Sequence, residues 1–276
     1  MMFDAGFRSE APALPRARGA VRVAVRSGPR GSCLDRLYQS GSAKCLLPRL
    51  PGRPGEVEAV LLNTAGGIAG GDRFAYSATA AEGAALTVTT QAAERVYRSI
   101  GGIGALEGRL SIAPGARIDW LPQETILFDG GALDRRLEVD MAADASLLAL
   151  EAVVLGRQAM GETVRTGHLT DRWRIRRDGC LVHAEALRLS GPVAEIAARP
   201  GCWGDARAAA TLLYVAPDAA DRLTALRERL PDTAGASAWD GKLVARLLAP
   251  TAREFRRALT AALGVFRPTL PAVWSS

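Results

Sequence analysis

A chain of 276 residues, 48% hydrophobic and 23% charged, holds enough apolar material for one sizeable core. Its formal net charge of +6 comes from 35 basic residues, nearly all Arg, scattered among 29 acids, and this scatter argues against nucleic-acid binding. No stretch approaches the ~18 uninterrupted apolar residues of a membrane span, and the N-terminus lacks the apolar region of a signal peptide.

Alternation of apolar and polar residues is the main signal along the first two thirds of the chain. Residues 1–19 are rich in Pro, Ala and Arg and are interpreted as a flexible lead-in. From about residue 20, short alternating runs such as Val21–Val25 and Leu137–Met141 are separated by turn signals such as APGA and RRDG. Many short strands with a turn about every ten residues predict a mainly β body over about 20–215.

Helical patterns appear toward the C-terminus, over about 217–264. Leu223, Leu226 and Leu230 fall on one helical face after Pro217, and Pro231 ends that run. A second helix is predicted after Pro250, where Thr251 and Glu254 have the spacing of a capping box. No boundary divides these segments from the β body, so residues 20–276 are predicted to form a single domain.

The segment NTAGGIAGGD (63–72) raises the question of a phosphate-binding loop. A dinucleotide loop needs a strand before its glycines and a helix after them, and a Walker A loop needs a following Lys-Ser or Lys-Thr. Here the flanking segments both have strand character. We therefore interpret the glycines as a corner between strands, with Asp72 either capping the turn or facing a cavity.

Residues for catalysis or tight metal binding are scarce. The chain has only two histidines, His168 and His183, and no G-x-S-x-G segment. Cys180 and His183 would lie on opposite faces of a regular strand, which excludes a shared metal. The four cysteines are far apart and include no CxxC pair, as expected for reduced thiols of a cytoplasmic protein.

Two acids stand in apolar surroundings. Glu151 interrupts the run LLALEAVVL, and period two places Glu185 on one face with Leu181, Leu187 and Leu189. A buried acid must be paired, protonated or in contact with water. Each can be a satisfied structural acid; together with Asp72 they indicate a polar interior passage or pocket.

Several segments, in order, resemble the urease accessory protein UreD (UreH) family. These are NTAGGIAGGD, TVTTQAAERVYRS (87–99), WLPQETILFDGG (120–131), EAVVLGRQAMGE (151–162) and DRWRIRRDG (171–179). The resemblance covers roughly residues 20–190. It implies a mainly β fold, a helix-like stack of β-sheets with a few helices, in agreement with the alternation.

The resemblance also implies a function. Members of this family are non-enzymatic cytoplasmic scaffolds that bind UreF, and through it the nickel-carrying GTPase UreG, and dock on urease apoprotein as part of a hetero-oligomer. No tightly bound cofactor is implied. Nickel in transit is implied to follow an internal passage, whose acids correspond here to Asp72, Glu151 and Glu185.

Two alternatives from other classes stay open at this stage. One is a nucleotide-binding hydrolase built on the corner from Gly66 to Asp72, which an ordered phosphate at Gly66–Gly71 would favour. The other is a generic β-rich scaffold or a basic nucleic-acid-binding protein, which salt-dependent retention on DNA would favour.

Overall fold

The computed structural model describes residues 15–50, 53 and 55–274. Residues 1–14 of the predicted lead-in lie outside this range, and the first strand begins at Arg18. The strands are Arg18–Gly28 (β1), Gly31–Gly41 (β2), Ala43–Leu46 (β3), Val57–Asn63 (β4), Arg73–Ala80 (β5), Ala85–Thr90 (β6), Glu94–Val96 (β7), Gly104–Ile112 (β8), Arg117–Leu121 (β9), Thr125–Leu127 (β10), Ala132–Met141 (β11), Ser146–Leu155 (β12), Gly167–Arg177 (β13), Cys180–Gly191 (β14), Ala208–Val215 (β15), Ala234–Trp239 (β16) and Lys242–Ala249 (β17).

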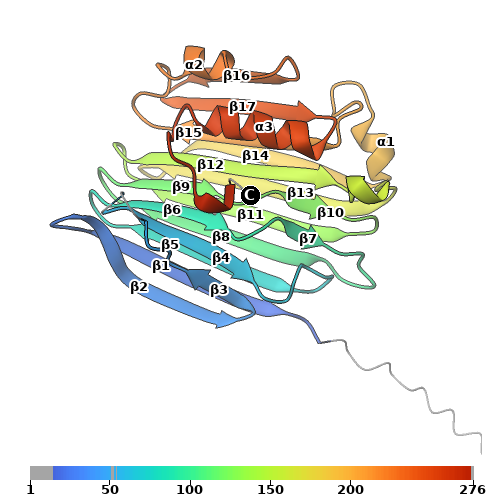
Figure 1. Ribbon diagram of the computed structural model, residues 1–276, viewed down its shortest axis with the longest axis horizontal. Coiled ribbons are helices and arrows are strands. Elements are labelled where there is room, and N and C mark those ends of the chain that lie inside the picture. Colours follow the sequence, from blue (N-terminus) through green and yellow to red (C-terminus); the bar gives the residue numbers. More distant parts are fainter. Residues whose placement is uncertain (1–14, 51–52, 54, 275–276) are drawn as a thin grey trace, which may run out of the picture.

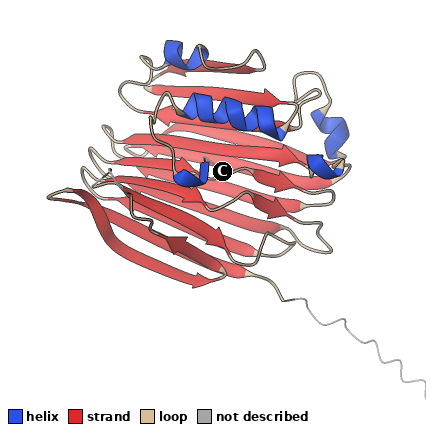
Figure 2. Cartoon of the chain, in the orientation of Figure 1, coloured by secondary structure: helices blue, strands red, loops and turns tan. Residues whose placement is uncertain are grey.

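Helices are few and short by comparison. The α-helices are Val193–Ala197 (α1), Leu223–Arg227 (α2) and Ala252–Leu263 (α3), and the 3-10 helices are Gln158–Met160 (η1) and Ala272–Trp274 (η2). Figure 2 shows how far the strands dominate, with the helices on one face and along the margin. The predicted mainly β fold class is confirmed.

The strands form two sheets stacked face to face. A seven-stranded sheet has the order β14-β13-β11-β8-β5-β1-β2, and a ten-stranded sheet runs β16-β17-β15-β12-β9-β6-β4-β3, with β10 and β7 paired beside β12. The chain alternates between the sheets as it advances, and most inner neighbours are parallel. The result is a solenoid-like stack in which the chain climbs steadily from β1 to β17 (Figure 1).

The main core fills the space between the sheets. It contains alternating residues that the sequence predicted, such as Val21 and Val139, and also Tyr76 and Trp173, each with at most 4% of its surface exposed. Inner strands such as β5 contribute every second side chain to this core, as expected for a pleated backbone.

A second core lies on the outer face of the ten-stranded sheet. There α3 contributes Phe255 and Leu259, which contact a cluster that includes Leu150 and Tyr214. The helix lies beside β17 and β15 in Figure 1. Leu148 of β12 belongs to this second core, while its neighbours Leu147 and Ala149 belong to the main core. Strand β12 is therefore buried on both faces, and this explains its near-continuous apolar sequence.

The C-terminal third is only partly as predicted. The predicted N-cap is confirmed, because the Thr251 hydroxyl accepts a hydrogen bond from the Glu254 N–H at 3.2 Å at the start of α3. Between the two predicted helices, β16 and β17 form a hairpin that was not predicted. Its turn is Asp240-Gly241, both with positive φ, a dipeptide that favours tight hairpins.

Candidate functional site

A buried arginine lies at the centre of the space between the sheets. Arg135 of β11 is 3% exposed, and its guanidinium Nη1 lies 2.6 Å from Glu151 Oε2 while Nη2 donates to Asp171 Oδ2 at 2.8 Å. Nη1 also donates to the Thr125 hydroxyl at 2.9 Å. Glu151 is on β12, so one guanidinium joins the seven-stranded sheet to the ten-stranded sheet.

The other carboxylate oxygen of Glu151 accepts a hydrogen bond from Trp120 Nε1 at 3.0 Å. Burial raises the pKa of Glu151 above its ordinary value, against the opposing effect of Arg135 and with a further rise from the charge of Asp171. Asp171 Oδ1 and Arg135 Nε are buried and have no hydrogen-bond partner among the described residues. This cluster of two carboxylates and one guanidinium is thus only partly satisfied, and it carries a formal net charge of −1.

The cluster borders a cavity of about 330 Å³. Arg135, Glu151 and Asp171 line its buried end, while Ala186 and Cys202, both exposed, line the other. The cavity lies where the seven-stranded sheet ends at β14 and the longer ten-stranded sheet continues to β17 and β16. It therefore connects a buried charged cluster to the surface of the stack.

Glu185 stands on the wall of the same cavity. It is opposite Trp173 in the β13–β14 pairing, on the inner face of β14, and its carboxylate forms an ion pair with Arg246 of β17. Two of the three acids singled out by sequence, Glu151 and Glu185, are thus brought to one cavity.

Asp72 lies elsewhere and has a structural task. Its carboxylate is 4% exposed and accepts hydrogen bonds from the backbone N–H groups of Ala69 and Ala17, both at 2.8 Å. It joins the glycine corner to the chain just before β1. Because β5 and β11 are two strands apart, Asp72 is separated from Arg135 by about 10 Å across the sheet.

The glycine corner is built for close backbone approach. Gly66, Gly67 and Gly71 have positive φ, and a Cβ on Gly70 would come within 2.5 Å of the Gly101 carbonyl oxygen. The N–H groups of Gly66, Ile68, Ala69 and Asp72 are all hydrogen bonded within the chain. These amides are therefore not available to cradle a phosphate.

Glu94 on β7 is an acid that the sequence analysis did not find. It accepts a hydrogen bond from Asn63 Nδ2 at 3.1 Å, and burial raises its pKa to about 7, with a smaller contribution from the charge of Asp72. In the β7–β10 pairing Glu94 is opposite Thr125, the residue whose hydroxyl meets Arg135. Polar groups therefore follow one another across the interior from the glycine corner to the cavity.

Two further members of the site were visible in the sequence pattern. In β11 the alternation that buries Leu133 and Leu137 also places Arg135 on the apolar face. In β13 the same rule places Asp171 between Leu169 and Trp173. In both strands, the signal in the sequence was a charged residue at a position that strand alternation assigns to the buried face.

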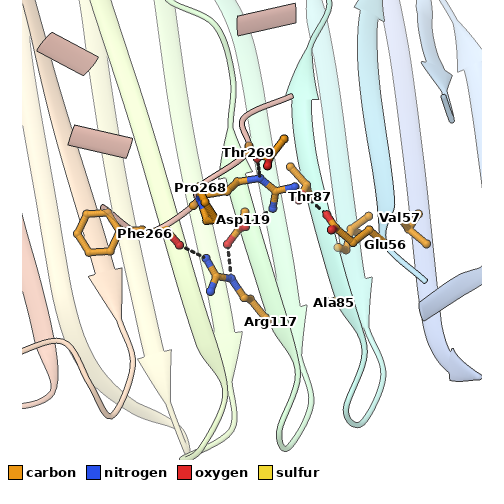
Figure 3. A pocket seen from close by; sticks show the side chains of 11 residues that line it. Glu56, Val57, Ala85, Thr87, Arg117, Asp119, Phe266, Pro268 and Thr269 are labelled. Carbon is orange, nitrogen blue, oxygen red and sulfur yellow. Dashed lines mark hydrogen bonds and ion pairs between the residues drawn. The ribbon is translucent and has the colours of Figure 1, made fainter. Parts of the chain in front are cut away.

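The chain has another pocket with paired charges, shown in Figure 3, beneath the segment that follows α3. Asp119, buried within it, binds Arg117 at 2.7 Å and Arg267 at 2.8 Å, and Arg267 also reaches Glu56 at 3.1 Å. The Phe266 carbonyl accepts a bond from Arg117 at 3.4 Å. These charges fasten the C-terminal segment to the ten-stranded sheet.

The histidines do not build a metal centre. The sequence predicted that Cys180 and His183 lie on opposite faces of a regular strand. The β13–β14 pairing contains a bulge, so simple alternation does not hold between these two residues. Cys180 is nevertheless exposed, whereas His183 is buried. Within the described residues, no three His, Cys, Asp or Glu side chains are grouped so as to hold a metal ion. None of the helices described is long and apolar enough to cross a membrane.

Comparison with known proteins decides the family. The family model of the UreD urease accessory protein matches residues 17–275. This chain belongs to the UreD family. It is 51% identical over 265 residues to urease accessory protein UreD of Xanthobacter autotrophicus, covering 95% of this chain and 91% of that protein. The proteins of the same description from Azorhizobium caulinodans (46% over 269 residues) and a Methylobacterium species (48% over 278) each cover 96% of this chain and match over 98% of their own length. The resemblance noted in the sequence is confirmed.

Proposed function

We propose that this chain is a non-catalytic cytoplasmic scaffold of urease maturation that lets nickel pass through its interior. The observation that carries the proposal is the cavity bordered by Glu151, Asp171 and Glu185 in a chain of the UreD urease accessory family. Nickel is the cargo in this proposal and is not a resident cofactor.

The donor set suits transport better than storage. Nickel(II) accepts carboxylate oxygen, water and imidazole, and a transit path must release what it binds. The polar groups that follow one another from Asp72 and Glu94 to Glu151 and Glu185 offer separate carboxylates instead of a closed cage of ligands. We propose these acids as the lining of the passage, with Asp72 fixed in place by its two backbone hydrogen bonds.

Partners complete the proposal. The matched relatives are described as urease accessory proteins, and we propose that this chain acts with UreF, with UreG through UreF, and on urease apoprotein, as a hetero-oligomer. A scaffold of this kind would place one end of the passage next to urease.

The alternative of a nucleotide-binding hydrolase has little support from the corner itself. Asp72 places a carboxylate against the glycine loop, and several of the loop's amides already have backbone or side-chain acceptors. A phosphate would meet negative charge there in place of free N–H donors.

The test is complementation. A urease-producing host that lacks its own UreD protein should regain nickel-loaded urease when this chain is supplied, and the tagged chain should co-purify with UreF and urease subunits. Restored nickel loading without any association, or association without restored loading, would contradict the proposal.

A further inference from the structure

The cavity is lined by three acids, Glu151, Asp171 and Glu185, and by three arginines, Arg135, Arg188 and Arg246, and the buried ion cluster places Arg135 at its inner end. Arg135 is the only base among the residues at the buried end of this cavity in the described structure, and it holds both Glu151 and Asp171. A divalent cation that approached these carboxylates would be repelled by the guanidinium beside them. The cluster as it stands therefore disfavours such a cation.

A purely structural ion cluster would be expected to satisfy its members fully. Here Asp171 Oδ1 and Arg135 Nε are buried without a partner among the described residues, although Asp171 and Arg135 both border the cavity. A carboxylate oxygen without a hydrogen-bond donor, on a residue that borders a cavity, is a ligand for a hard or borderline cation that reaches it. The cluster therefore has coordinating capacity that the arginine does not use.

Charge also favours an exchange. Two carboxylates with one guanidinium leave a net charge of −1, whereas two carboxylates with one divalent cation are neutral. The guanidinium is at the end of a flexible side chain beside the cavity, so it can leave the carboxylates without a change in β11. A monovalent cation would gain nothing by replacing it.

We propose that Arg135 is an internal counter-ion that a divalent cation displaces from Glu151 and Asp171. The arginine keeps the two acids occupied when no cargo is present and weakens the binding of cargo when it arrives. This inference rests on the proposed transport function, but it concerns cation binding by this chain and is measured separately.

The experiment titrates the purified full-length chain with Ni²⁺ alone, in a calorimeter, near neutral pH. Arg135→Met should bind Ni²⁺ at least about tenfold more tightly than the unchanged chain, since a like charge beside the ligands is gone. Arg135→Lys keeps the charge and should stay close to the unchanged chain. Arg246→Met, which frees Glu185 at the outer part of the cavity, is the matched control and should change the affinity much less than Arg135→Met.

Glu151→Gln added to Arg135→Met should abolish the gain. A folded Arg135→Met variant that binds Ni²⁺ no more tightly than the unchanged chain would overturn the proposal, as would an equal gain in Arg246→Met. Circular dichroism establishes the fold of every variant.

Loss of the arginine leaves two buried carboxylates without their shared cation, and Arg135→Met can fail to fold for that reason. The unchanged chain then supplies the test through Trp120, whose indole donates to Glu151. Co²⁺ bound at Glu151 should quench a fluorescence component that is missing in Trp120→Phe. Identical quenching in the two proteins would refute the proposal. Nickel loading of urease is a separate readout, so a failure of transport and a failure of this exchange are distinguishable.

Discussion

Replacing Asp72 by alanine is expected to destabilise the whole stack. The carboxylate accepts two backbone hydrogen bonds, from Ala69 and Ala17, and it is almost completely buried. A hydrogen bond to a charged group contributes about 1.5–3 kcal/mol, so losing both, with partial replacement by water, should cost about 3–5 kcal/mol. That is a large part of the total stability of about 5–15 kcal/mol that is typical of a folded protein.

The assay is thermal unfolding followed by circular dichroism. The expected loss corresponds to a fall in Tm of roughly 6–20 °C. Asp72→Asn keeps one acceptor oxygen, so its Tm should lie between that of Asp72→Ala and that of the unchanged chain. Asp144→Ala is the control, because the exposed Asp144 carboxylate accepts one bond, from the Gly115 N–H at 3.0 Å, and its loss should cost no more than about 1 kcal/mol. An Asp72→Ala protein that melts within about 2 °C of the unchanged chain would refute the role of this carboxylate in the corner.

Three further outcomes are expected. Burial raises the pKa of Glu94 from 4.5 to about 7, so its contribution to the free energy of unfolding is fully present below pH 4.5 and is lost as the pH rises through 7. In urea unfolding, the unchanged chain should therefore lose at most about 3 kcal/mol of stability at this site between pH 5 and 8, and Glu94→Gln should not show this loss. Thr251→Ala removes the N-cap of α3 and should lower the free energy of unfolding by about 1 kcal/mol, and an unchanged urea midpoint would contradict the cap. Arg267→Ala leaves Asp119 with Arg117 alone, so limited proteolysis should cut after Phe266 sooner than in the unchanged chain; equal cutting rates would show that the segment is fastened by other contacts.

The strands could be predicted from sequence because apolar and polar residues alternate where successive side chains point to opposite faces of a sheet. Val21 and Val139 lie in the core where their spacing placed them. The β16–β17 hairpin lies between the two predicted helices, in a stretch between Pro231 and Pro250 for which no element was predicted. Leu230 follows α2 instead of belonging to it, since the helix ends at Arg227.

The site was predictable only in part, for a physical reason. An acid in an apolar run, such as Glu151, is conspicuous, whereas Arg135 stands in the charged segment DRRLE and is distinguished only by its phase in the strand. Which acids share a cavity depends on how the two sheets stack, and the stacking brings Asp171 to Glu151 across 20 residues of sequence. Sequence grouped Asp72 with Glu151 and Glu185, but only the last two border the same cavity.

The measurement that tests the central claim most directly is the nickel content of urease matured with a Glu151→Gln, Glu185→Gln double variant of this chain. Glutamine keeps the shape of each side chain and one acceptor oxygen while removing its charge. The account predicts that this variant folds and still associates with UreF and urease in a pull-down from the same samples, while nickel per urease falls clearly below that obtained with the Asp144→Ala control. Nickel content equal to the control, with association intact, would contradict a passage lined by these acids.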